Sequence, residues 1–166
     1  MSARLEKEYY PGGAIKIYQY YYNDKLHRDD GPAREYFYEN GALLRSLWYN
    51  HGVLHRNDGP AYQEFLPNGL VMISSWRNAG VRHRLSGPAY ESFYKSGKIR
   101  TRTWHINGRP HREDGPAEEL FFENGRHKKT VYYLDGCFLS EEDYRRRVSL
   151  LKLSANVNTD YGVSLC

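Results

Sequence analysis

Short segments rich in aromatic and β-branched residues alternate along this chain with small clusters of Asn, Asp, Gly and Pro. In one stretch, a segment of β-compatible residues at 61–66 is followed by a Pro-Asn-Gly turn, a second segment at 70–76 and a further turn that ends at Gly80. Two such segments joined by Asn-Gly are typical of a β-hairpin, because both turn residues tolerate a positive φ. The pattern therefore predicts a succession of short antiparallel strands.

The same pattern recurs with a period of 28 residues. Four histidines are each followed by an arginine and, shortly afterwards, by Gly-Pro-Ala. These positions are His27, His55, His83 and His111, then Arg28, Arg56, Arg84 and Arg112, then Gly31, Gly59, Gly87 and Gly115. A column of aromatic residues has the same period, at Tyr20, Trp48, Trp76, Trp104 and Tyr132. No residue is inserted or lost between copies, and this regularity indicates a stacked repeat array.

We expect an all-β fold, an elongated antiparallel meander of tandem 28-residue β-hairpin repeats with a short C-terminal capping helix. The repeats occupy residues 1–139, with a partial copy at 9–26 and full units starting near 27, 55, 83 and 111. Residues 140–153 form the helix, for which Ser140 is a suitable N-cap, and residues 154–166 form a tail. The apolar stripe of that helix is expected at Tyr144, Val148, Leu151 and Leu150.

Tyrosine is unusually abundant, with sixteen in the chain, and suits the two faces of a thin sheet. A run of it at residues 18–22 has no obvious cover, and an open aromatic edge is either a hazard or an interface. We therefore expect a homo-oligomer, such as a homodimer, formed through this Tyr-rich N-terminal edge or through one face of the sheet.

The net charge of +4 is mild, but two basic clusters stand near the C-terminal end. They consist of Arg126, Lys128 and Lys129, and of Arg145, Arg146 and Arg147. Such clusters suit contact with an acidic ligand, either nucleic acid or an anionic phospholipid, or they are simply solvated positive surface.

The two cysteines, Cys137 and Cys166, are too few for a disulfide framework, although a single bridge stays open. The N-terminal residues lack the apolar region of a signal peptide, and no apolar run is long enough to span a membrane. An intracellular location is the expectation.

The His-Arg-x-Asp-Gly segment admits several interpretations. A protein-kinase catalytic loop is excluded, since no Gly-rich loop accompanies it and the required Asn is missing. Successive units should lie about 9.6 Å apart. We therefore expect no two of the four imidazoles to share a pocket or a metal ion, whose ligands lie within about 2.1 Å. Two interpretations remain: each loop binds a small anion, or Arg28 and Asp30 bridge one turn while His27 contacts the neighbouring unit. The tryptophans are expected to pack, with base stacking as the alternative.

The run Trp48-Tyr-Asn-His-Gly52, with His55, Phe65 and the next tryptophan, Trp76, resembles the MORN repeat. The period of 28 and the sequence His-Arg-x-Asp-Gly-Pro-Ala depart from the usual pattern. They are similar to the variant form found in bacteria, phages and, in many copies, giant DNA viruses such as marseilleviruses. The resemblance implies tandem β-hairpins and a role in scaffolding, self-association and contact with proteins or acidic lipids. It also implies action in the host cytoplasm or nucleus, or in the virion.

We expect a non-enzymatic repeat scaffold that mediates protein–protein interaction and self-association, without catalytic residues, metal site or cofactor. The alternative is a binder of acidic ligands through the C-terminal basic clusters. An antitoxin-like or effector role rests on analogy alone.

Overall fold

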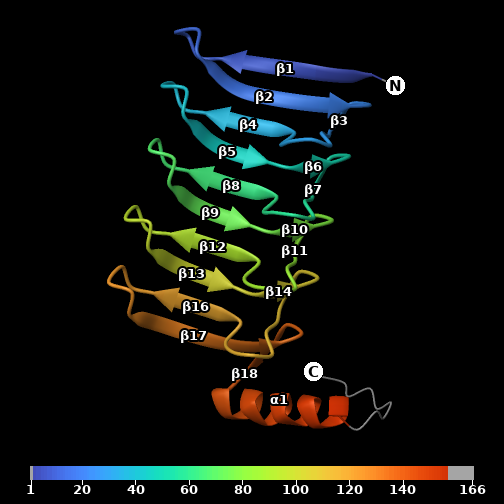
Figure 1. Ribbon diagram of the computed structural model, residues 1–166, viewed down its shortest axis with the longest axis vertical. Helices are drawn as coiled ribbons and strands as arrows, with labels where there is room; N and C mark the ends of the chain where they lie inside the picture. The colour runs from blue at the N-terminus through green and yellow to red at the C-terminus, as the bar shows by residue number, and fades with distance from the viewer. Residues whose placement is uncertain (1, 157–166) are drawn as a thin grey trace.

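The computed structural model describes residues 2–156 and has the form of a ladder of short strands (Figure 1). The N-terminal hairpin consists of β1 (Ala3–Tyr9) and β2 (Ile15–Tyr22), and β3 (Lys25–Leu26) pairs with the end of β2. The strands that continue the large sheet are β4 (Arg34–Phe37), β5 (Leu43–Leu47), β8 (Tyr62–Phe65), β9 (Val71–Ser75), β12 (Tyr90–Phe93), β13 (Ile99–Thr103), β16 (Glu118–Phe121), β17 (His127–Leu134) and β18 (Cys137–Leu139).

Three small hairpins lie outside this sheet, and one helix follows it. The hairpins pair β6 (Tyr49–Asn50) with β7 (Val53–Leu54), β10 (Arg77–Asn78) with β11 (Val81–Arg82), and β14 (His105–Ile106) with β15 (Arg109–Pro110). The helix is α1 (Glu141–Asn156). In Figure 1 the turns of the main hairpins project along one long side, and the small hairpins line the opposite side.

The large sheet has twelve strands, of which eleven follow one another in an antiparallel meander, while β3 pairs with β2 beside this path. Neighbouring hairpins pair directly: Gln63 of β8 lies opposite Ser46 of β5 in the preceding hairpin, and opposite Ser74 of β9 within its own hairpin. The predicted fold class, an elongated antiparallel meander of tandem hairpins with a short C-terminal helix, is confirmed.

The two turns of each unit differ in backbone geometry. At the Asn-Gly turn only the glycine has a positive φ, as at Gly41 (83°), and Gly41 N–H donates to Tyr38 O at 2.9 Å. This arrangement is a three-residue loop with a bulge. At the second turn both residues have a positive φ, as at Ala79 and Gly80. The two-residue turn with two positive φ angles therefore lies at the second turn of each unit and not at Asn-Gly.

The core of the repeat region is thin, and a column of alanines is among its most deeply buried residues. Ala33, Ala61, Ala89 and Ala117 are all fully buried. Each alanine carbonyl accepts the backbone N–H of the preceding residue in the aromatic column, at 2.7–2.8 Å. Since two backbone segments approach closely at this point, a small side chain fits best.

A tyrosine hydroxyl links neighbouring units beside the Asn-Gly turns. Tyr10 donates to Phe37 O at 2.9 Å, and the equivalent hydroxyls of Tyr38 and Tyr94 donate at 3.0 and 2.8 Å. The same column holds Leu66 and Phe122, which lack the hydroxyl. Units are therefore joined by hydrogen bonds at this side as well as by strand pairing.

The helix closes the C-terminal end of the sheet, below β18 in Figure 1. Ser140 caps it, since its Oγ accepts the Asp143 N–H at 3.1 Å. Tyr144 and Val148 are buried against Leu134 and Leu139. Leu150, however, is 60% exposed, so its inclusion in the apolar stripe is wrong.

The helix extends past residue 153 to Asn156. Residues 157–166, which make up most of the expected tail, lie outside the described residues. No helix among residues 2–156 is long and apolar enough to cross a membrane.

The N-terminal edge of the sheet differs from the sequence-based expectation. The Tyr-rich run 18–22 lies in β2, which β1 covers from Ala3 to Tyr9. The edge strand is therefore β1, and all seven of its residues are exposed. The tyrosines are inside the sheet and do not form its open edge.

Candidate functional site: the row of His-Arg loops

The arginine of each His-Arg loop stacks on the aromatic column. The guanidinium carbon lies 4.2 Å from the ring centroid of Tyr20 for Arg28, and 3.8–4.0 Å from the tryptophan in the other copies. The other pairs are Arg56 with Trp48, Arg84 with Trp76, and Arg112 with Trp104. A cation over an aromatic face is stabilised by the ring quadrupole. The tryptophans thus form a platform for the protein's own arginines.

In three of the four loops the arginine also binds a carboxylate two residues later. The Nε–Oδ1 distances are 2.7 Å for Arg28 and Asp30, 2.8 Å for Arg56 and Asp58, and 2.6 Å for Arg112 and Asp114. The hydrogen bond from Arg28 holds the pKa of Asp30 below its usual range, and Asp30 in turn raises the pKa of Arg28.

The glycine of the loop leaves room for the guanidinium. A Cβ at Gly59 would lie 2.6 Å from the guanidinium carbon of Arg56, and one at Gly31 would lie 2.8 Å from that of Arg28. The arginine is therefore held between an aromatic ring and bare backbone.

The histidine of each loop accepts a hydrogen bond from the next unit. The Nδ1 atoms of His55, His83 and His111 accept the backbone N–H of the first residue of the following two-residue turn, at 3.2, 3.0 and 3.0 Å. His27 makes the same contact at 3.4 Å. The residue before the histidine accepts the N–H of the turn glycine, as in Gly80 N–H to Leu54 O at 2.9 Å. Both contacts expected of the first loop, the Arg28–Asp30 bridge and the link from His27 to the neighbouring unit, are present.

Grooves run between consecutive loops. The first, of about 510 Å³, is lined by His27 and His55 together with their arginines and acidic residues. The expectation that no two of these imidazoles share a pocket is therefore wrong for this pair, because a single groove spans both loops. Within residues 2–156 no group of three or more His, Cys, Asp or Glu side chains is arranged to hold a metal ion.

The third loop departs from the others in sequence and in shape. Leu85 and Ser86 occupy the positions of the variable residue and the aspartate, and Leu85 is 83% exposed. Gly87 has a φ of 119°, whereas its three counterparts have no positive φ. The groove between the second and third loops, about 280 Å³, is lined by Arg56 and Arg84 and by no carboxylate.

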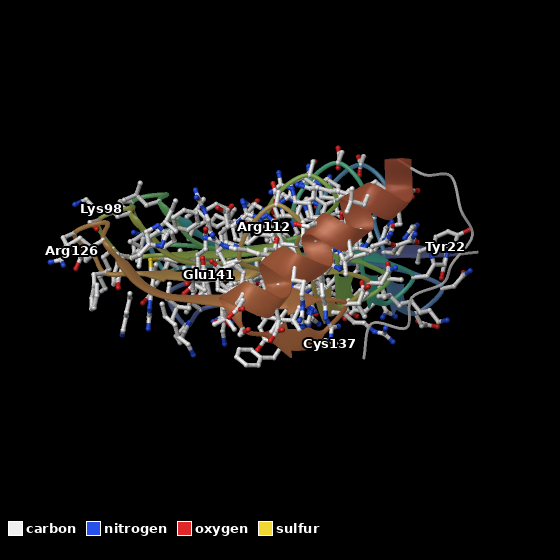
Figure 2. The ribbon with its side chains drawn as sticks, turned by 90° about the horizontal axis from the view of Figure 1, so that it is seen from below. Tyr22, Lys98, Arg112, Arg126, Cys137 and Glu141 are labelled. Carbon is white, nitrogen blue, oxygen red and sulfur yellow. The ribbon has the colours of Figure 1, made fainter. Side chains whose placement is uncertain are left out.

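The two basic clusters lie apart. Figure 2, seen along the stack, shows Arg126 at the turn side of the sheet, beside Lys98 one repeat earlier, and Glu141 well away from it. In the helix, Arg145 binds Glu141 at 2.5 Å and Arg146 binds Asp143 at 2.8 Å. Lys128 and Lys129 are exposed on β17. Arg126 and the first turn of the helix therefore do not lie on one common positive patch.

A buried histidine outside the loops, His105, is 9% exposed and its Nδ1 has no hydrogen-bond partner. Burial lowers its pKa, and the charge of Arg82 lowers it further. The sequence singled out only the histidines of the repeated column. The signal for His105 was its place directly after Trp104, where the neighbouring units have Arg77 and Tyr133.

Comparisons of this chain with protein-family models, with curated proteins and with solved structures find no match. The similarity to MORN repeats therefore remains a resemblance in sequence pattern.

Proposed function

We propose that this protein is a non-enzymatic repeat scaffold that associates with a second copy of itself edge to edge through β1. The observation that carries the proposal is the difference between the two ends of the sheet. The helix covers the C-terminal end, whereas among residues 2–156 no strand pairs with the outer side of β1.

The outer side of β1 presents backbone groups with the spacing of a strand ladder. Asn23 N–H donates to Ser2 O, and Tyr20 N–H donates to Ala33 O on the other side of β2. Because hydrogen-bonded pairs alternate in an antiparallel sheet, Arg4 and Glu6 direct their N–H and C=O groups toward β2. Those of Leu5 and Lys7 then point outward, where a second strand can pair with them.

The sequence of β1 is complementary to itself. In a twofold antiparallel pair centred on Leu5, each Arg4 lies opposite the Glu6 of the second copy, and the two leucines face each other. Charges on an edge strand normally prevent pairing, but here opposite charges meet at both cross-strand positions. In the single chain Arg4 already contacts Glu6, at 3.0 Å, so both side chains lie on the same face.

Charge reversal tests the proposal. We expect sedimentation equilibrium to show a monomer–dimer equilibrium, and Arg4→Glu or Glu6→Arg to weaken it by about tenfold or more, since like charges then face each other twice. The double variant R4E/E6R restores the opposite pairs and should recover the dimer.

Two controls separate association from folding. The thermal unfolding midpoints of dilute variants should match that of the parent chain, because these side chains are exposed. Hydrogen exchange at the Leu5 and Lys7 amides should slow as protein concentration rises. A chain that stays monomeric at high concentration, or a double variant that does not recover, would contradict the proposal.

The alternative of acidic-ligand binding through the C-terminal clusters has less support. Arg145 and Arg146 are already engaged by acidic side chains of their own helix, and Arg126 lies at a distance from that helix (Figure 2). An intracellular location, in an infected host cell or a virus particle, is part of our proposal only through the resemblance to MORN repeats.

A further inference from the structure

The third His-Arg loop lacks the carboxylate that its three counterparts contain. Arg28, Arg56 and Arg112 each donate from Nε to an aspartate, whereas Ser86 stands at that position after Arg84. Within residues 2–156 no salt bridge to Arg84 is found. Glu91, the counterpart of the Glu119 that contacts Arg112, is engaged by Arg102 at 3.2 Å.

The guanidinium of Arg84 nevertheless stacks on the aromatic column as in the other loops and makes the same carbonyl contact as Arg112. It lies 4.0 Å from the centroid of Trp76, and its Nη1 donates to Pro88 O at 3.1 Å. Arg112 makes the matching bond to Pro116 O at 3.2 Å. Since the ring and the carbonyl hold the guanidinium of Arg84 as they hold that of Arg112, we infer that its Nε–H is directed as in the fourth loop, where it meets an aspartate oxygen.

The groove beside this loop also differs in charge. It is lined by Arg56, Arg84, His83 and Trp76 without any carboxylate. By contrast, Asp29, Asp30 and Asp58 line the first groove, and Glu113 and Asp114 line the one that follows the third loop. Of these three grooves, only the middle one is lined by arginines without a carboxylate.

We propose that this middle groove binds an acidic side chain of a partner polypeptide, whose carboxylate accepts the Nε–H of Arg84. A carboxylate is the chemistry that the same loop accepts in three other copies, at 2.6–2.8 Å. The neighbouring Leu85, with 83% of its surface exposed, favours a ligand that carries an apolar residue beside the acidic one. A volume of about 280 Å³ suits a few side chains.

The proposal is tested by NMR on ¹⁵N-labelled protein, dilute enough to be monomeric, so that its outcome does not depend on pairing through β1. The titrant is a capped peptide with the sequence Gly-Gly-Glu-Leu-Gly-Gly, and the control peptide has Gln in place of Glu. We expect the Nε–H signal of Arg84 and the indole N–H signal of Trp76 to shift and saturate with the Glu peptide. The Gln peptide should bind at least fivefold more weakly.

Ser86→Asp is the decisive variant, because it gives the third loop the sequence feature of the other three. We expect S86D to fold normally and to lose the response, while Ser86→Asn, of similar size but uncharged, keeps it. In the reciprocal variant, Asp58→Ser, the Nε–H signal of Arg56 should begin to respond to the Glu peptide.

Three results would overturn the proposal. In the first, the signals of Arg28, Arg56 and Arg112 shift as much as that of Arg84, which indicates unspecific attraction. In the second, S86D titrates like the parent chain. In the third, a peptide with phosphoserine in place of Glu binds while the Glu peptide does not, which assigns the groove to phosphate.

Discussion

The two ends of this sheet differ in how the unpaired strand edge is treated: one is covered by a helix and the other is exposed. At the C-terminal end, Leu134 is fully buried, and the helix packs Tyr144 and Val148 against it. At the N-terminal end, β1 is exposed along its whole length and carries Arg4, Glu6, Lys7 and Glu8. An array of identical units needs a different sequence only where it stops. The C-terminal end is therefore closed by apolar packing, whereas the N-terminal edge strand is exposed and only its charged side chains govern which strands can pair with it.

Replacing one leucine at each end of the sheet is the strongest test of this difference in packing. Leu134→Ala should lower the free energy of unfolding by about 3 kcal/mol, because it opens a cavity in the small core under the helix. Leu5→Ala, at a position 45% exposed, should change it by less than about 0.5 kcal/mol. Urea unfolding of dilute protein measures both, and equal losses would show that the two ends do not differ in packing.

A pair of tyrosines gives the next effect in size. Tyr144→Phe leaves the Gly115 N–H without its acceptor, which lies at 2.9 Å, and should cost about 1–2 kcal/mol. Tyr9→Phe, at an edge position 56% exposed, is the matched control and should be nearly neutral. If the two substitutions are equivalent in urea unfolding, the hydroxyl of Tyr144 does not fasten the helix to the last loop.

The helix cap should have an effect of about 1 kcal/mol. Ser140→Ala removes the acceptor of the Asp143 N–H and frees the first turn. Ser149→Ala, farther along the same helix, removes only a hydroxyl that donates to Arg145 O and serves as the control. The loss should appear in circular dichroism as an earlier onset of helix melting, while the strand signal of the array is unchanged.

The smallest effect is alkaline sensitivity at the closed end. Burial raises the pKa of Tyr144, although the hydrogen bond from Gly115 opposes this shift. Burial also raises the pKa of Tyr132, whose ring lies 4.8 Å from that of Tyr144. As the pH rises, these two hydroxyls therefore ionise in the unfolded chain before they do so in the folded protein. The free energy of unfolding is unaffected below about pH 10 and falls as the pH rises further. Tyr144→Phe should remove part of this slope, as measured by urea unfolding at a series of alkaline pH values.

The repeat region was predictable because its constraints recur. The glycines, alanines and tryptophans occupy fixed positions in each unit, so the period of 28 and the hairpin pattern indicated the meander directly. The Ser140 cap was readable for a similar reason, since the residue types at a helix start follow from its unsatisfied N–H groups.

The edge strand was not predictable from alternation of polar and apolar residues. Both faces of β1 are exposed, and its sequence therefore has no apolar period to mark it as a strand. The Tyr-rich run next to it has the stronger pattern because it lies inside the sheet. There the tyrosine rings pack against neighbouring side chains and their hydroxyls form hydrogen bonds, as Tyr21 does with Gln19.

The loop chemistry was partly readable. The spacing of Arg28 and Asp30 indicated their bridge, and the loss of the aspartate at Ser86 was visible in the sequence. What the loss does to Arg84 required the structure, because only the contacts to Trp76 and Pro88 show that the guanidinium stays in place.

The hydrogen bonds made by the histidine column give the array a direction and a fixed step. Each imidazole accepts a hydrogen bond from the unit that follows it, so a whole unit duplicated in the middle would find the same partners on both sides. Gain or loss of one unit would then lengthen or shorten the molecule by a constant increment and leave both termini chemically unaltered. The length of such an array would therefore follow directly from the number of units that it contains.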